Sequence, residues 1–114
     1  MHKQGDIVLI PIPFTDLTTT KKRPVLVMSS DYYNDTADDI IVVAITSNVD
    51  EKPYNVSLTS DDLVEGELLK NSCIKSDKLY TLAQSIVIKK FGHVKNNIIK
   101  EVNEKIAEIL GSEK

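Results

Sequence analysis

The chain has 114 residues and a formal net charge of −3, because 17 Asp and Glu outnumber 14 Lys and Arg. This length suits one domain over residues 1–114, with a core large enough to fold without disulfides. The acidic balance argues against a protein that coats nucleic acid through a general basic surface. One Cys, two widely separated His and no apolar run near ~20 residues also argue against a metal site, a bound cofactor and a membrane span.

The charges are distributed unevenly along the chain. Residues 1–30 hold four Lys and Arg against two Asp, residues 31–67 hold one against ten acids, and residues 68–114 hold nine against five. A fold that brings the two ends together would therefore gather cations on one face. The first residues lack the long apolar segment and small-residue cleavage site of a secretory signal, so a cytoplasmic protein is expected.

Two strands separated by a polar loop are predicted near the N-terminus. Asp6–Phe14 is rich in strand-forming residues, but Pro11 and Pro13 lack the N–H that a sheet ladder requires. The second half of this strand is therefore expected at an edge or a bulge. Thr15–Lys22 is predicted to be the polar loop, and Arg23–Ser30 the second strand.

The middle of the chain contains the best candidate for a core strand. Asp39–Ser47 is an unbroken run rich in β-branched residues, which predicts a central strand buried on both faces. The segments on either side, Asp31–Asp38 and Asn48–Pro53, have turn-forming compositions. Tyr54–Thr59 then alternates apolar and polar residues as a half-buried strand does.

The last part of the chain combines strands with one helix. Ser60–Leu63 is predicted to be an N-capped helical turn, and Ser72–Leu82 and Gln84–Lys90 to be strands that precede a turn at Gly92. Asn96–Leu110 places its apolar residues at helical spacing and is followed by glycine, which predicts one amphipathic helix. Five to seven short strands and a terminal helix indicate a mainly β (α+β) fold, a small, strongly bent antiparallel barrel or open barrel.

The chemistry available to such a barrel is limited by what the sequence lacks. It has no glycine-rich phosphate loop, no Cys/His cluster and no Gly-x-Ser-x-Gly nucleophile elbow. Two classes remain: a binding barrel, or an enzyme that acts on phosphates with Arg, Lys and hydroxyl groups. Arg23 begins a predicted strand beside a polar loop, and Thr46 lies at the end of the core strand. Side by side, a guanidinium and a hydroxyl could hold a phosphodiester through three hydrogen bonds.

RNA supplies its own nucleophile next to each phosphate. An enzyme that holds the phosphate need only position the 2′-hydroxyl, stabilise the developing charge and help the leaving oxygen depart. Arg23 and Thr46 are therefore candidate catalytic residues for RNA cleavage. The alternatives are that Arg23 belongs to a solvated charged loop and that Thr46 is only a strand-forming residue.

Four stretches of the sequence carry a resemblance to a known family. Gly5–Val8 (GDIV), Arg23–Val27 (RPVLV), Ala44–Ser47 (AITS) and Asn71–Asp77 (NSCIKSD), followed by the closing helix, resemble the MazF/PemK toxins of bacterial toxin–antitoxin systems. The resemblance implies a small SH3-like barrel, a homodimer, and metal-independent cleavage of single-stranded RNA that leaves a 2′,3′-cyclic phosphate. It also implies growth inhibition through loss of translation, and neutralisation by a cognate antitoxin.

The resemblance also assigns roles to residues. Arg23 matches the family's catalytic arginine, which would stabilise the pentacovalent phosphate and protonate the leaving 5′-oxygen. Thr46 matches the catalytic threonine, which would bond the phosphate or the attacking 2′-oxygen. The loop before Arg23 lacks the Gly-Ser-Glu-Gln pattern of many members, so no catalytic glutamate is carried over. At Asp77-Lys78 the family often has an acid followed by Gln, so only the acid corresponds.

Further residues are expected to contact RNA around this pair, as phosphate contacts, groove lining or a stacking platform for bases. They are Lys21, Lys22, Thr20, Ser47, Asp77 and Tyr80. A polar loop that contains Thr20 is also compatible with a simple turn. His93 is expected to be a surface or capping histidine, and Cys73 a buried core residue. The alternative function is a non-catalytic SH3-like barrel that binds a protein segment in the same groove.

Overall fold

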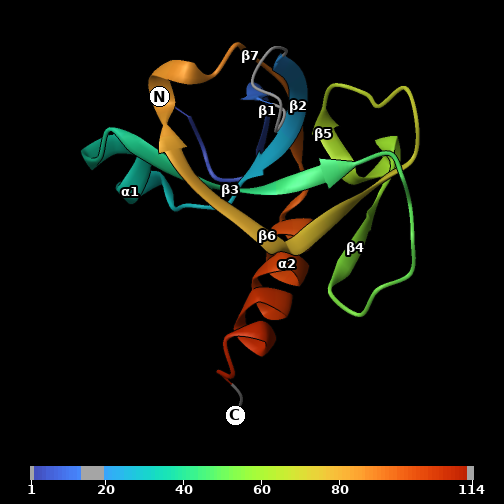
Figure 1. Cartoon of the computed structure of the whole chain (residues 1–114). Helices are drawn as coiled ribbons and strands as arrows, with labels where there is room; N and C mark the ends of the chain where they lie inside the picture. The colour runs from blue at the N-terminus through green and yellow to red at the C-terminus, as the bar shows by residue number, and fades with distance from the viewer. Residues whose placement is uncertain (1, 14–19, 113–114) are drawn as a thin grey trace.

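The computed structural model describes residues 2–13 and 20–112, and within them seven strands form one antiparallel sheet (Figure 1). The order of the strands is β4-β6-β3-β2-β1-β7-β5. The strands are β1 (Asp6–Pro13), β2 (Thr20–Val27), β3 (Asp39–Thr46), β4 (Asn55–Leu58), β5 (Leu63–Glu65), β6 (Ser72–Ala83) and β7 (Lys89–Val94). The helices are α1 (Asp31–Thr36) and α2 (Asn96–Ile109), with 3-10 turns η1 (Ser60–Asp62) and η2 (Gln84–Ile86).

The two outermost strands of the sheet show why it curves. β4 and β5 lie at opposite ends of the strand order but are consecutive in the chain, joined only by Thr59 and the short turn η1. So short a connection brings the two edges close together, because each residue spans at most ~3.6 Å. The sheet therefore bends into an open barrel, and α2 extends from one end of it (Figure 1). The predicted mainly β open barrel with a C-terminal helix is confirmed.

Buried apolar side chains form two clusters, one on each face of the central strands. The larger contains Ile7, Leu26, Met28, Val43, Ile45, Val56, Leu58, Leu63, Ile74, Val94, Ile98 and Val102, and the smaller Val8, Ile10, Val25, Val27, Ile40 and Val42. β3 supplies residues to both, which confirms the prediction of a central strand buried on both faces. Cys73 is also buried, as expected.

The prolines of β1 lie where only one neighbour strand is present. β7 pairs with β1 from Asp6 to Leu9, whereas β2 pairs with β1 as far as Pro13. Pro11 and Pro13 therefore face an unpaired edge on one side, as predicted, and their missing N–H groups cost no hydrogen bond there.

The second strand begins earlier than predicted. Thr20, Lys21 and Lys22 pair with the end of β1 and belong to β2, so the prediction that they form part of a loop is wrong. Pairing with an existing strand outweighs the weak strand preference of lysine. Residues 14–19, the rest of the predicted loop and the end of the first predicted strand, lie outside the described residues.

Two segments differ from their predicted type. Asp31–Thr36 is a short helix rather than a turn, because the Ser30 hydroxyl caps it by accepting the Tyr33 N–H at 3.1 Å. The predicted strand Gln84–Lys90 begins instead with the 3-10 turn η2, where the Gln84 amide donates to the Asn34 carbonyl at 2.8 Å. A side chain that bonds across the fold in this way is invisible to local sequence patterns.

Two features of strands β5 and β7 also differ from the sequence prediction. β5 was not predicted, and Gly92 lies inside β7 rather than in a turn. A Cβ on Gly92 would meet the Glu65 carbonyl oxygen at 3.1 Å, so glycine allows β5 and β7 to approach closely. The predicted turn near Ser60 is confirmed as η1, in which the Asp62 carboxylate accepts the Thr59 N–H at 2.8 Å.

The C-terminal helix closes one end of the barrel. α2 buries Ile98 and Val102 against the larger cluster, as its apolar spacing predicts. It ends before Gly111, which adopts a left-handed φ of 79° and donates to the Glu108 carbonyl. Among the described residues, no helix is long and apolar enough to span a membrane.

Candidate active site

Arg23 and Thr46 come from the neighbouring strands β2 and β3. The ladder between these strands ends with Val25 opposite Ala44, and the same antiparallel register extended by two residues sets Arg23 against Thr46. Both positions share the face of the sheet that carries Val25 and Ala44, because side chains alternate along a strand. The structure thus brings together the two residues that the sequence singled out.

A depression of about 250 Å³ contains both side chains. Its lining comprises Arg23, Pro24, Val25, Ala44, Ile45, Thr46 and Tyr80. Tyr80 comes from β6, where it pairs with Val42, and it is 46% exposed. Three adjacent strands therefore contribute a guanidinium, a hydroxyl and an aromatic ring to one concave surface.

The Thr46 hydroxyl is held by the backbone two residues later. Its Oγ1 accepts the N–H of Asn48 at 3.0 Å, in the turn by which the chain leaves β3. An oxygen that accepts this bond keeps its own hydrogen for a ligand. This role of Asn48 was missed in the sequence, although a Thr that bonds the N–H of the second residue after it is a known turn pattern.

Arg23 is exposed and available to a ligand. Among residues 2–13 and 20–112 its side chain makes no hydrogen bond or ion pair. Its backbone is nevertheless fixed, since it pairs with Ile10 of β1. A guanidinium on a rigid strand can present two parallel N–H groups to an anion with little loss of backbone entropy.

The lysines before Arg23 are divided between two faces. Lys21 and Lys22 are both exposed in β2, and alternation places Lys21 on the face of Arg23 and Lys22 on the other. Only Lys21 is therefore positioned to support the depression. Thr20 is the first residue of β2, opposite Pro13.

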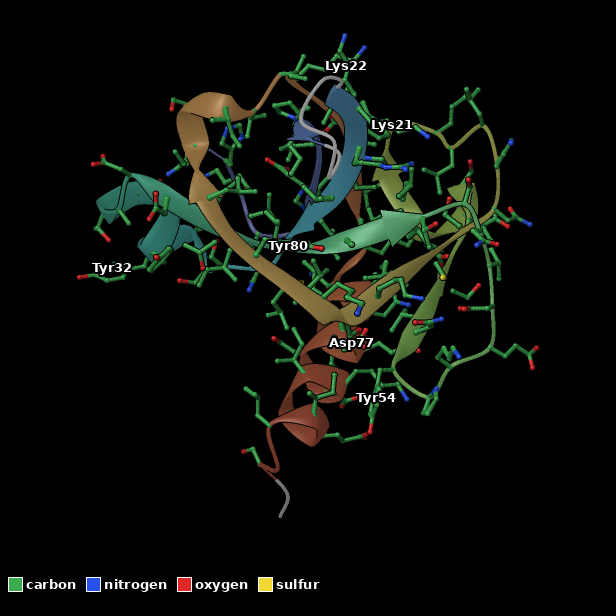
Figure 2. All side chains as sticks on the ribbon, in the orientation of Figure 1. Lys21, Lys22, Tyr32, Tyr54, Asp77 and Tyr80 are labelled. Atoms are coloured by element: carbon green, nitrogen blue, oxygen red, sulfur yellow. The ribbon has the colours of Figure 1, made fainter. Side chains whose placement is uncertain are left out.

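Asp77 is not brought to this depression. Val43 pairs with Leu79, but the next β3 residue, Ala44, pairs with Lys75, so β6 has three extra residues here. Asp77 lies in this bulge. Figure 2 shows it at the bend of β6 over α2, remote from the lysine-bearing end of β2. Asp77 therefore does not line the depression with Arg23, because the bulge removes it from the ladder, and its predicted contact with RNA stays a prediction.

Ser47 lines a different cavity from its neighbour Thr46. This second cavity measures about 500 Å³ and is bounded by Leu9 of β1, Phe91 of β7 and the segment that follows β5. Ser47 itself is exposed. Consecutive residues at the end of β3 therefore open onto two separate hollows.

His93 is partly buried and contacts a carboxylate, Asp6, which is itself buried. Its Nδ1 lies 2.8 Å from Oδ1 of the buried Asp6, and Lys90 Nζ lies 3.5 Å from the same oxygen. The other carboxylate oxygen, Oδ2, accepts the Lys3 N–H at 2.9 Å. Burial alone would raise the pKa of Asp6, but these three partners outweigh it and the pKa lies below the ordinary value. Lys90 also contacts Glu65, which chiefly raises the pKa of the lysine. The expectation of a surface or capping histidine was wrong.

This network fastens the N-terminal turn to β7 and does not line the depression. Among the described residues, no three His, Cys, Asp or Glu side chains are placed to share a metal ion.

Comparisons with known proteins agree with this architecture. Residues 3–110 match the family described as the PemK-like, MazF-like toxin of type II toxin–antitoxin system. No curated protein sequence matches the chain significantly. Among solved structures, an endoribonuclease in complex with its cognate antitoxin from a Mycobacterial species has a TM-score of 0.83 at 18% identity, with 100% of this chain and 99% of that chain covered.

Two further structures are similar over nearly the whole chain. MazF in the MazE-MazF complex (Form-II) from Deinococcus radiodurans has a TM-score of 0.81 at 20% identity, covering 98% of this chain and 97% of that chain. The Mycobacterium tuberculosis toxin MazF-mt6 has a TM-score of 0.76 at 20% identity, covering 96% and 99%. At these identities the likeness defines a class, the small open β-barrels of the MazF fold. The match over residues 3–110 defines the family: the chain belongs to the PemK-like, MazF-like toxins of type II toxin–antitoxin systems.

Proposed function

We propose that this chain is an endoribonuclease that cuts single-stranded RNA, with the scissile phosphate held between Arg23 and Thr46. The observation that carries the proposal is that these two side chains, from the neighbouring strands β2 and β3, line one depression. Family membership supports the same function, as does the similarity in fold to an endoribonuclease from a Mycobacterial species.

The two residues divide the work on the phosphate. Arg23 donates two N–H groups to the non-bridging oxygens and stabilises the charge of the pentacovalent phosphate. The Thr46 hydroxyl acts as a donor, because its oxygen already accepts the Asn48 N–H. The adjacent 2′-oxygen forms a bond to phosphorus and releases its proton to solvent water, while the bond from phosphorus to the 5′-oxygen breaks and that oxygen takes up a proton, assisted by Arg23. The products are a 2′,3′-cyclic phosphate and a 5′-hydroxyl.

Neighbouring residues position the strand. Tyr80 offers a half-exposed ring on which a base next to the cleaved bond can stack. Lys21, on the face of Arg23, adds attraction for phosphates. The reaction needs no metal, since guanidinium and hydroxyl groups supply the stabilisation.

The partners follow from the family. A cognate antitoxin neutralises the chain, and two copies form the active homodimer. The structural neighbours described with an antitoxin support the first of these statements.

The test is cleavage of a labelled single-stranded RNA with EDTA present. The parent is expected to produce 2′,3′-cyclic ends, and Arg23→Ala or Thr46→Ala to lower the rate by ~100- to 1,000-fold, as loss of a transition-state donor does elsewhere. Lys100→Ala, on the exposed surface of α2, is the control and keeps the parent rate. If Arg23→Ala and Thr46→Ala both cut at the parent rate, the assignment is wrong.

A second function, a non-catalytic barrel that binds a protein segment, is favoured by the net charge of −3, which disfavours a polyanionic ligand. It predicts that the parent itself leaves the RNA intact while it binds a peptide. The same assay therefore separates the two functions.

A further inference from the structure

The cavity of about 500 Å³ beside Ser47 has no role in the cleavage step described above. It is lined by residues from the end of β3, from β1 and β7, and from the segment that links β5 to β6. Its apolar lining comes from Leu9, Leu68, Leu69 and Phe91, and Lys89 stands opposite Leu9 in the β1–β7 ladder.

The wall formed by residues 67–70 is held at several points. Gly66 adopts a left-handed φ of 87°, and a Cβ there would lie 2.3 Å from the Phe91 carbonyl oxygen, so the chain runs directly against β7. The Ser60 hydroxyl then bonds both the N–H of Leu68, at 2.8 Å, and its carbonyl, at 3.3 Å. Further on, the Ser72 hydroxyl donates to the carbonyl of Lys70 at 3.1 Å. These bonds fix the position of residues 67–70 without a ligand.

One apolar residue of this wall, Leu69, is exposed to water. Leu68 packs on the larger core cluster, but the next residue, Leu69, is 101% exposed. Leu69 is thus held by fixed neighbours at the lip of the apolar cavity, where its whole side chain is accessible to a ligand.

The charges around the cavity favour an anionic ligand. Lys70 and Lys89 are exposed lining residues, against Glu67 alone. Lys22 lies on the same face of the sheet as Leu9, because its neighbour two positions on, Pro24, is the cross-strand partner of Leu9. The cavity thus combines an apolar floor with a cationic rim, which suits a nucleobase and its phosphate.

The cavity and the depression are neighbours at the end of β3, on opposite faces of the sheet. Thr46 lines the depression and Ser47 lines the cavity, and adjacent Cα atoms lie only ~3.8 Å apart, so one RNA strand that passes around the end of β3 can reach both. We infer that the cavity is a nucleotide subsite for the same RNA strand: it binds a base flanking the cleaved phosphodiester on Leu9, Leu69 and Phe91, and that nucleotide's phosphate at Lys89. This inference rests on the proposed function. It identifies the cavity as a determinant of which RNA sequence is cut.

The experiment measures RNA binding separately from cleavage. A fluorescein-labelled 2′-O-methyl oligoribonucleotide of mixed sequence, which cannot be cut, is titrated with the full chain and followed by anisotropy. The variants Leu69→Ser and Lys89→Gln alter exposed side chains and leave the core intact. The matched controls are Val64→Ser, an exposed apolar residue of β5, and Lys100→Gln on α2. Unmodified RNA is then cleaved by each variant and its cut sites are mapped.

We expect each cavity variant to raise the Kd by about fivefold or more, and the controls to stay within about twofold of the parent. Lys89→Gln should also reduce the slope of log K against log salt by about 0.7, the value for one lost phosphate contact with a single strand. Leu69→Ser should in addition change the base preferred next to the cut.

Three outcomes overturn the inference. If the parent cuts RNA but both cavity variants bind and select cut sites as the parent does, the subsite is wrong and the proposed function stands. If the parent neither binds nor cuts RNA, the proposed function fails and the subsite fails with it. If the variants keep their RNA affinity but lose binding of a synthetic peptide of alternating Glu and Leu, the cavity belongs to a protein segment.

Discussion

The bond from the Asn48 N–H to Thr46 Oγ1 makes a sharp prediction, because a backbone donor can be deleted by proline. Asn48→Pro removes the only hydrogen bond that the structure gives the Thr46 hydroxyl within the described residues, whereas Asn48→Ala keeps it. Without this donor the hydroxyl can turn its hydrogen away from the phosphate. The variant should therefore lower the rate of the chemical step and leave substrate binding nearly unchanged.

The magnitude follows from the bond itself. A neutral hydrogen bond of this kind, 3.0 Å long and exposed, contributes about 0.5–1.5 kcal/mol, which corresponds to about a 2- to 12-fold loss of rate. Thr46→Ala, which deletes the donor to the phosphate, should cost ~100-fold or more. Asn48→Pro should thus fall between Asn48→Ala and Thr46→Ala.

The assay is single-turnover cleavage of labelled RNA at saturating protein, with thermal unfolding as the check on folding. Val49→Pro places a proline one residue later and controls for loop stiffening; Val49 is 56% exposed. In a Thr46→Ala background, Asn48→Pro should have no further effect, because the group it orients is absent. Equal rates for Asn48→Ala and Asn48→Pro, or an undiminished effect in that background, would refute the reasoning.

Three other predictions concern stability and binding. Because the pKa of Asp6 is lower in the folded than in the unfolded chain, its carboxylate stabilises the fold above the unfolded pKa, and this stability is lost as pH falls through the folded pKa. Asp6→Asn should therefore flatten the acid limb of a plot of unfolding free energy against pH. An unchanged acid limb would contradict this role of Asp6. Gly66→Ala should lower the free energy of unfolding by about 1–3 kcal/mol, as measured with urea. Gly111→Ala should cost less, because Gly111 has a similar φ but open space where the Cβ would lie. Equal losses would show that the approach of Gly66 to Phe91 does not matter. Tyr80→Ala should weaken RNA binding by about 1–3 kcal/mol in the anisotropy titration, while Tyr32→Ala, on α1, should not.

The parts of the fold that were predictable have strong local signals. The core strand was recognised from its unbroken β-branched run, and the helix α2 from its period and its terminal glycine. The meeting of Arg23 and Thr46 was also predictable, since each lies where a polar segment meets an apolar strand. These features depend on residues close to each other in the sequence, or on two neighbouring strands.

The parts that were missed depend on contacts between distant segments. The strand positions of Lys21 and Lys22 arise from pairing with β1, and η2 is tied down by the Gln84 side chain, which reaches α1. Asp77 lies away from Arg23 because of a bulge in β6, and the three extra residues of this bulge have no clear pattern in the local sequence. His93 found a partner, Asp6, 87 residues away.

The uneven distribution of charge becomes meaningful once the sheet order is known. β2, β1 and β7 are adjacent, so Lys21, Lys22 and Arg23 from the N-terminal block lie near Lys89 from the C-terminal block, as expected if the chain ends come together. Lys90, in contrast, pairs with the carboxylates of Asp6 and Glu65. The acids of residues 31–67 lie mainly in α1, at the start of β3, in η1 and β5, and in the loops between these elements. Because fields near a surface depend on local charge within roughly 10 Å in physiological salt, a protein of net charge −3 can still attract a polyanion at β2 and β7.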